Sequence, residues 1–207
     1  IESTNTDSYT AEIYKSSLSN FNPIYVGVYS GYVNSLIDMH VTSNEVLYIL
    51  HSPGIVKIEN NIQEIFLETS YIYNMEFNSN NDSYFYSTNS SVYNNSGDVI
   101  FSDNGGISSL VYNLSTEKLF VLANDYRLVS LDYPNNIEHF PSNWGGDFYI
   151  YPKEFDVLLD NNTPIFYFMS NGSISKCTSE NDLQIIKTVS TPSNDQFYNI
   201  VINQINN

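Results

Sequence analysis

The chain has 207 residues, of which 42% are hydrophobic and 15% aromatic, and its formal net charge is −16 at pH 7. This apolar content is enough for one folded domain and excludes a chain that is disordered throughout. Lys and Arg together number only seven. Because nucleic acids and anionic membranes are bound through clustered cations, we expect neither as a partner.

The N-terminal region is polar at first and then strand-like. Residues 1–20 predict an extended arm or an outer strand, and Tyr25 follows in the alternating segment 23–34, PIYVGVYSGYVN. No run of apolar residues approaches the length of a membrane span, so we expect no membrane insertion. The start at Ile1 instead of Met suggests a processed product. Together with the acidity, it predicts an extracellular or secreted protein.

A short phrase recurs five times from residue 38 onward. It consists of a small polar residue, an aliphatic residue and, two positions later, another apolar residue. The copies are Asp38-Met39-x-Val41, Asn74-Met75-x-Phe77, Ser109-Leu110-x-Tyr112, Asp156-Val157-x-Leu159 and Asn199-Ile200-x-Ile202. Their spacings of 36, 35, 47 and 43 residues are typical of a β-propeller, in which one small antiparallel sheet repeats around an axis.

Further apolar positions follow each of the first four copies at similar distances. The second position is an aromatic residue within an apolar run: Tyr48, Phe85, Phe120 and Phe166. The third is apolar: Val56, Tyr93, Leu128 and Ile174. With alternation inside each run, these offsets predict three strands joined by turns.

Glycine and proline mark the connections between these strands. Gly31, Gly54 and Gly172 share one position of the repeat, which predicts tight hairpins with positive φ. The segment 133–151 contains both Pro and Gly and predicts an extended loop, which accounts for the 47-residue spacing.

The two ends of the chain complement each other. Asn199 opens a repeat with no second half, and Tyr25 belongs to a repeat with no first half. The strand near 197–202 is therefore expected to join the N-terminal strands in one blade, because closure protects sheet edges. The sequence predicts an all-β, five-bladed β-propeller that forms a single domain over residues 1–207.

The segment from Ser43 to Asn61, SNEVLYILHSPGIVKIENN, resembles the repeats of the broad NHL, YWTD and Yellow-like propeller group in its turn, apolar pair, hairpin and short strand. The resemblance extends in pattern over most of the chain. It implies the propeller fold and carries no function, since the YWTD tetrapeptide and the dipeptides of the WD type do not occur.

The five polar residues that open the phrase are the first candidate site. If the phrase opens the innermost strand of each blade, these residues form a ring at one mouth of the channel: Asp38, Asn74, Ser109, Asp156 and Asn199. Such a ring could hold Ca²⁺, which takes six to eight oxygen ligands. The simpler interpretation is that the side chains bond to neighbouring backbone. It is favoured because calcium sites usually carry more negative charge.

The second candidate is the segment 142–148, SNWGGDF, which holds the only Trp. We interpret Trp144, Asn143 and Asp147 as ligand-binding residues on a rim loop. An exposed Trp beside glycines presents a rigid aromatic face to a protein or glycan partner. The alternative is a Trp that folds back over a blade edge.

The sequence carries no specific catalytic or zinc-binding signature. His40, His51 and His139 lack metal-ligand spacing, and no GxSxG motif occurs. A Ser-His-Asp site assembled from distant residues stays open. Cys177 is the only cysteine, which excludes an intrachain disulfide, and we expect it to be buried in the strand 173–178.

These observations predict a non-enzymatic, extracellular ligand- or protein-binding propeller that needs no cofactor. One alternative is a lactonase-like hydrolase with an axial Ca²⁺, and another is a structural or assembly subunit of a larger secreted or viral protein. Six Asn-x-Ser/Thr sequons are present, which chance alone explains in so Asn-rich a chain. They permit glycosylation without indicating secretion.

Overall fold

The computed structural model describes residues 9–17, 20–31, 36–42, 46–51, 54–69, 71–78, 83–132, 135–141, 154–161, 163–170, 173–179 and 182–188. Within these ranges the chain forms strands and turns and contains no helix. The prediction of an all-β protein is confirmed.

The described strands form four four-stranded antiparallel sheets and one hairpin, and within each sheet every strand pairs with the next along the chain. Sheet I contains β3 (Leu36–Val41), β4 (Leu47–His51), β5 (Gly54–Glu59) and β6 (Ile62–Glu68). Sheet II contains β7 (Asn74–Asn78), β8 (Ser83–Ser87), β9 (Ser91–Asn94) and β10 (Val99–Ser102). Sheet III contains β11 (Ile107–Asn113), β12 (Lys118–Ala123), β13 (Leu128–Leu131) and β14 (Ile137–Phe140). Sheet IV contains β15 (Glu154–Asp160), β16 (Thr163–Ser170), β17 (Ser173–Cys177) and β18 (Gln184–Thr188). The N-terminal hairpin pairs β1 (Tyr9–Ser17) with β2 (Asn20–Gly31).

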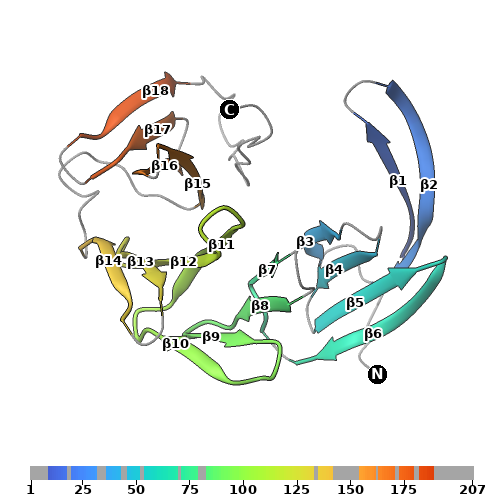
Figure 1. Ribbon diagram of the computed structural model, residues 1–207. Helices are drawn as coiled ribbons and strands as arrows, with labels where there is room; N and C mark the ends of the chain where they lie inside the picture. The colour runs from blue at the N-terminus through green and yellow to red at the C-terminus, as the bar shows by residue number, and fades with distance from the viewer. Residues whose placement is uncertain are drawn as a thin grey trace, which may run out of the picture.

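The four sheets follow one another around an arc, with their first strands on the inside and their fourth strands on the outside (Figure 1). The first strands are neighbours in sequence order: β3 lies beside β7, β7 beside β11, and β11 beside β15. This is the arrangement of blades in a β-propeller. The first four copies of the recurring phrase all lie in these first strands.

Side chains of each first strand alternate between the two neighbouring sheets. His40 of β3 stacks on Phe77 of β7, with ring centroids 4.5 Å apart. The side-chain amide of Asn113 in β11 donates a hydrogen bond to the Val157 carbonyl of β15 over 2.9 Å. Because successive side chains point to opposite faces of a strand, the polar residues of the first three copies face the following sheet. The apolar pairs of the second to fourth copies face the preceding sheet.

Hydrophobic clusters fill the spaces between successive sheets. Sheets I and II contribute Leu50, Ile55, Met75 and Phe77 to one cluster, which Ile72 joins from the connection between β6 and β7. Sheets II and III contribute Val92, Leu110, Leu119 and Val121 to a second, and sheets III and IV contribute Phe120, Phe140, Val157, Phe166 and Phe168 to a third. In the third cluster the rings of Phe120 and Phe166 meet edge to face, with centroids 5.8 Å apart. The core therefore lies between blades, and no sheet is buried by itself.

Cys177 belongs to the third cluster and is 3% exposed. The expectation that the only cysteine is buried in a strand is confirmed. Burial raises the pKa of its thiol to about 12. The thiol therefore stays protonated and behaves as a small hydrophobic group.

Two details of the predicted repeat are wrong. Each sheet has a fourth, outer strand, and β14 lies inside the segment where a loop is expected. Gly54 opens β5 without a positive φ. A Cβ at this position would collide with the Leu67 carbonyl oxygen of β6, so it is the close approach of the outer strand that requires glycine. Gly31 ends β2, and Gly172 lies outside the described residues.

One apolar pair lacks the cover that its equivalents have. Met39 and Val41 of β3 are each 53% exposed. Met75 of β7 and Val157 of β15, which follow the polar residue as Met39 does, are 2% and 0% exposed. Among the described residues, Ile13 of β1 packs on the cluster of β4 and β5 at the same face of sheet I. The inner edge of this face is thus the open end of the described arc.

Packing of the apolar pair against the preceding sheet can be tested with Val157→Thr. Threonine has nearly the same shape, so the substitution buries a hydroxyl between sheets III and IV and is expected to lower the free energy of unfolding by about 1–3 kcal/mol. The matched control is Val99→Thr in β10, where the side chain is 55% exposed and the change should stay within about 0.5 kcal/mol. Equal losses in urea unfolding of the two variants would contradict this packing.

Candidate functional site

The structure places four of the five candidate ring residues near the start of successive first strands. Asp38, Ser109 and Asp156 are the third residues of β3, β11 and β15, and Asn74 opens β7. Asn199 lies outside the described residues. Ser109 and Asp156 are buried, and Asp38 is partly buried.

Asp38, Asn74 and Asp156 make side-chain hydrogen bonds within their own sheets. Asp38 Oδ1 accepts from the Met39 N–H and Asp156 Oδ1 from the Val157 N–H, both over 2.7 Å. The Asn74 side-chain amide donates to Ser87 Oγ over 2.9 Å. Within the described ranges, no group of three His, Cys, Asp or Glu side chains could hold a metal ion. In Asp38 and Asp156 the carboxylate thus accepts a hydrogen bond from the next backbone N–H. Bonds of this kind belong to the simpler interpretation of the ring, in which the side chains bond to neighbouring backbone.

Burial changes the chemistry of Asp38 more than its hydrogen bond does. Desolvation raises the pKa of the Asp38 carboxyl, and the bond from the Met39 N–H lowers it by less. A folded-state pKa above the unfolded value of about 3.8 means that Asp38 contributes stability below pH 3.8. That contribution is lost as the pH rises through the folded-state pKa. At neutral pH the charged Asp38 side chain therefore destabilises the folded state.

Two of the three histidines act as packing groups. His40 stacks on Phe77, and burial lowers its pKa, which favours the neutral ring. His139 Nε2 lies 2.9 Å from Ser130 Oγ, and its pKa is lowered by burial and then by the charge of Lys118. Ser130 is only 1% exposed. This Ser–His pair therefore cannot act on a substrate from solution without opening the core.

Trp144, Asn143 and Asp147, the candidate residues of the rim loop, lie outside the described residues. The described residues on either side of this segment belong to β14, which ends at Phe140, and to β15, which begins at Glu154.

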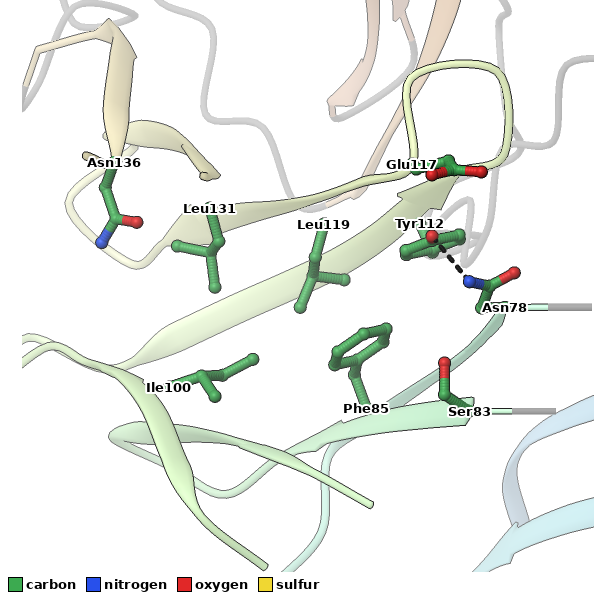
Figure 2. Close-up of a pocket in the computed structure, with 9 residues that line it drawn as sticks. All are labelled: Asn78, Ser83, Phe85, Ile100, Tyr112, Glu117, Leu119, Leu131 and Asn136. Carbon is green, nitrogen blue, oxygen red and sulfur yellow. Dashed lines mark hydrogen bonds between the residues drawn. The ribbon is translucent and has the colours of Figure 1, made fainter. Parts of the chain in front are cut away.

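A pocket of about 400 Å³ lies between sheets II and III. In Figure 2 two rows of side chains face each other across it. Sheet III contributes Tyr112 of β11, Leu119 of β12 and Leu131 of β13, which are successive partners in the strand register. Phe85 of β8 and Ile100 of β10 form the apolar wall on sheet II.

Polar groups gather at the ends of this pocket. At the inner end the Asn78 side-chain amide donates a hydrogen bond to the Tyr112 hydroxyl over 2.8 Å, and Glu117 lies beside that tyrosine (Figure 2). Burial and then the charge of Glu117 raise the pKa of Tyr112, and the bond from Asn78 lowers it. Ser83 lies near the inner end and Asn136 at the outer end (Figure 2). The pocket thus has apolar walls and polar ends.

This pocket was not predicted from the sequence, although two of its aromatic residues stand at positions of the repeat. Phe85 is the second-position aromatic and Tyr112 the last apolar residue of the third phrase. One signal was present: Tyr112 carries a hydroxyl where the other copies have Val41, Phe77, Leu159 and Ile202. A pocket between blades also depends on how two sheets pack against each other, and the sequence of one repeat does not show this.

No family model matches the chain, and no curated protein is significantly similar to it in sequence. Solved structures match in fold. An auxiliary nutrient binding protein from Bacteroides thetaiotaomicron aligns with a TM-score of 0.56 at 11% identity, over 84% of this chain and 53% of that protein. Sqt1 of Saccharomyces cerevisiae aligns with a TM-score of 0.53 at 15% identity, over 91% of this chain and 59% of that protein. The extracellular domain of the putative hybrid two-component system BT3049 from B. thetaiotaomicron aligns with a TM-score of 0.50 at 10% identity, over 84% of this chain and 24% of that protein.

These similarities show the fold, in which four-stranded antiparallel sheets are arranged as in a propeller. The chain spans 53% and 59% of the length of the first two of these proteins. Among the described residues, no helix has the length and apolar character that a membrane crossing requires.

The role of Asp38 can be tested with Asp38→Asn, which keeps an acceptor for the Met39 N–H and removes the buried charge. We expect the variant to be more stable than the wild type at pH 7, with a gain that shrinks as the pH falls toward 4, because the wild-type carboxyl then becomes protonated. Urea unfolding at several pH values measures this gain.

Any Asp→Asn change also eases the self-repulsion of a chain with net charge −16. The control is therefore Asp160→Asn, which removes an exposed carboxylate at the end of β15. A calcium ring predicts the opposite sign: Ca²⁺ would stabilise the wild type relative to EDTA, and Asp38→Asn would abolish that effect.

Proposed function

We propose that the chain is a non-enzymatic binding module built on a five-bladed β-propeller, with a small-molecule pocket between two blades. The pocket between sheets II and III carries this proposal. Its volume of about 400 Å³ falls within the range of about 300–1,000 Å³ that is usual for small-molecule sites. Apolar walls with a few polar groups are also the usual lining of such sites.

The fifth copy of the phrase closes the ring in this proposal. Asn199-Ile200-x-Ile202 forms the innermost strand of a blade whose outer strands are β1 and β2. By the alternation seen in the other first strands, Ile200 and Ile202 then face sheet IV, and Val201 faces the apolar pair of β3. The exposure of Met39 and Val41, at 53% each, supports a strand at this place, since their equivalents are covered by the preceding blade. Residues 1–207 then form one domain.

The rim loop is a second contact region in this proposal. Trp144, with Asn143 and Asp147, presents an aromatic face to a protein or glycan partner outside the cell. An extracellular location is supported by the acidity of the chain and by the extracellular domain among the structures with this fold.

A second candidate is an assembly role, in which the chain is one part of a longer secreted or viral propeller. The open face of β3 and the greater length of the similar structures favour it. In that case a blade from outside these 207 residues covers Met39 and Val41.

The pocket is tested with phenylbutanol, a neutral probe with an apolar body. Calorimetric titration should show saturable binding to the wild type. Ile100→Trp fills the pocket from its sheet II wall and should weaken binding about tenfold or more. The control is Val99→Trp, which adds the same side chain at the adjacent, 55% exposed position of β10 and should leave the affinity unchanged. If phenylbutanol does not bind, or if the two variants bind it alike, the pocket has no role in recognition.

A further inference from the structure

We infer that the pocket between sheets II and III selects small amphiphilic amines, with the apolar body between the two sheets and the cationic head beside Glu117 and Tyr112. This inference rests on the proposed binding function and adds the charge of the ligand. It assigns one end of the pocket to recognition of the head and the walls to recognition of the body.

The walls offer an apolar body its main contacts. Leu119 is 3% exposed, and Phe85, Ile100 and Leu131 are partly buried around the same space. Phe85 and Tyr112 stack on each other across the junction, with ring centroids 5.5 Å apart and planes at 17°. Because the two ring faces are turned toward each other, they do not offer the open aromatic platform on which a sugar stacks. A hydrocarbon or aromatic chain suits such walls better.

Charge separates the two ends of the pocket. Among the described residues that line the pocket, Glu117 is the only charged one, and none of them is Lys or Arg. The nearest cation along the chain, Lys118, pairs with Asp132 over 2.8 Å. Since strand alternation turns Lys118 to the opposite face from Leu119, its ammonium group is not directed into the pocket. An anionic ligand would therefore meet Glu117 with no counter-charge, whereas a cation would be attracted.

The Glu117 end also offers hydrogen-bond acceptors. In the bond between Asn78 and Tyr112 the amide donates, so the phenol oxygen at this end is already acting as an acceptor. The pKa of Tyr112 responds to Glu117, which places the two groups within electrostatic range. An ammonium head here gains a carboxylate partner in Glu117 and can donate to the phenol oxygen of Tyr112.

The backbone of Glu117 is in the left-handed region. Glu117 ends the turn between β11 and β12 with φ at 54°, a left-handed conformation that suits Asn and Gly better than Glu. The turn between β5 and β6 uses Asn60 and Asn61 at positive φ, and the turn after β15 uses Asn161. The described chain also has Tyr71 and Tyr126 at positive φ, so this conformation is not reserved for Asn and Gly in this fold.

The test compares three probes of matched shape: phenylbutylamine, phenylbutanol and phenylbutyrate. Calorimetric titration of the full chain at low ionic strength should show the amine binding about fivefold tighter than the alcohol, because Glu117 is exposed and its ion pair is partly screened. The carboxylate should bind more weakly than the alcohol. The preference for the amine should fall as salt is added.

Glu117→Gln removes the charge and keeps the side-chain length. This variant should bind the amine and the alcohol with equal affinity. Glu138→Gln, which removes an exposed charge from β14 outside the pocket lining, is the matched control and should keep the preference for the amine.

The outcomes separate this inference from the proposed function. If the alcohol binds at the pocket and the amine binds no better, the pocket is real and the inference of amine selection is overturned. If the preference survives in Glu117→Gln or disappears equally in Glu138→Gln, it comes from the overall charge of the chain and the assigned site is wrong. If none of the probes binds, the proposed function fails together with the inference.

Discussion

The constraint on which this structure depends is the strict alternation of side chains along the first strand of each sheet. A strand points successive residues to opposite faces, so a phrase of one polar and two apolar residues commits its apolar pair to the preceding blade. Met75 and Val157, at 2% and 0% exposure, owe their burial to a neighbouring sheet and not to their own. The burial of each apolar pair therefore depends on the preceding blade. Met39 and Val41, at the start of the arc, are exposed because no described blade covers them.

The same constraint accounts for the pocket. Packing between sheets II and III is tight at the cluster around Val92, Leu110 and Val121. It opens where the two sheets reach the ends of β7 and β11. There the last apolar position of the phrase is Tyr112, whose hydroxyl needs a partner when buried and finds it in Asn78. A polar group at a place that the other repeats fill with hydrocarbon leaves space and hydrogen-bonding groups together.

Much of the fold could be predicted from the sequence because the apolar positions that must be buried recur at regular distances in each repeat. The inner strands and the second and third strands carry apolar residues that must be buried, as the aromatic positions Phe120 and Phe166 illustrate. The outer strands could not be predicted in this way: Ile62 and Ile65 of β6 are 67% and 72% exposed, so burial imposes no pattern on them. Among the candidate sites, the first four polar phrase residues lie on the first strands of their sheets, but the bonds of Asp38 and Asp156 to the adjacent backbone need coordinates. The pocket depends on two sheets at once and on Glu117 in a turn, which no periodic pattern displays.

The most direct measurement of ring closure uses the three methionines of the chain as reporters. Met75 and Met169 are 2% and 3% exposed, and oxidation of methionine by peroxide follows accessibility. If the fifth copy of the phrase covers the inner edge of sheet I, mass spectrometry of the peroxide-treated chain will find that Met39 oxidises as slowly as Met75 and Met169. Oxidation of Met39 at the rate of the urea-unfolded chain, with Met75 and Met169 still protected, would contradict closure of the ring by this chain.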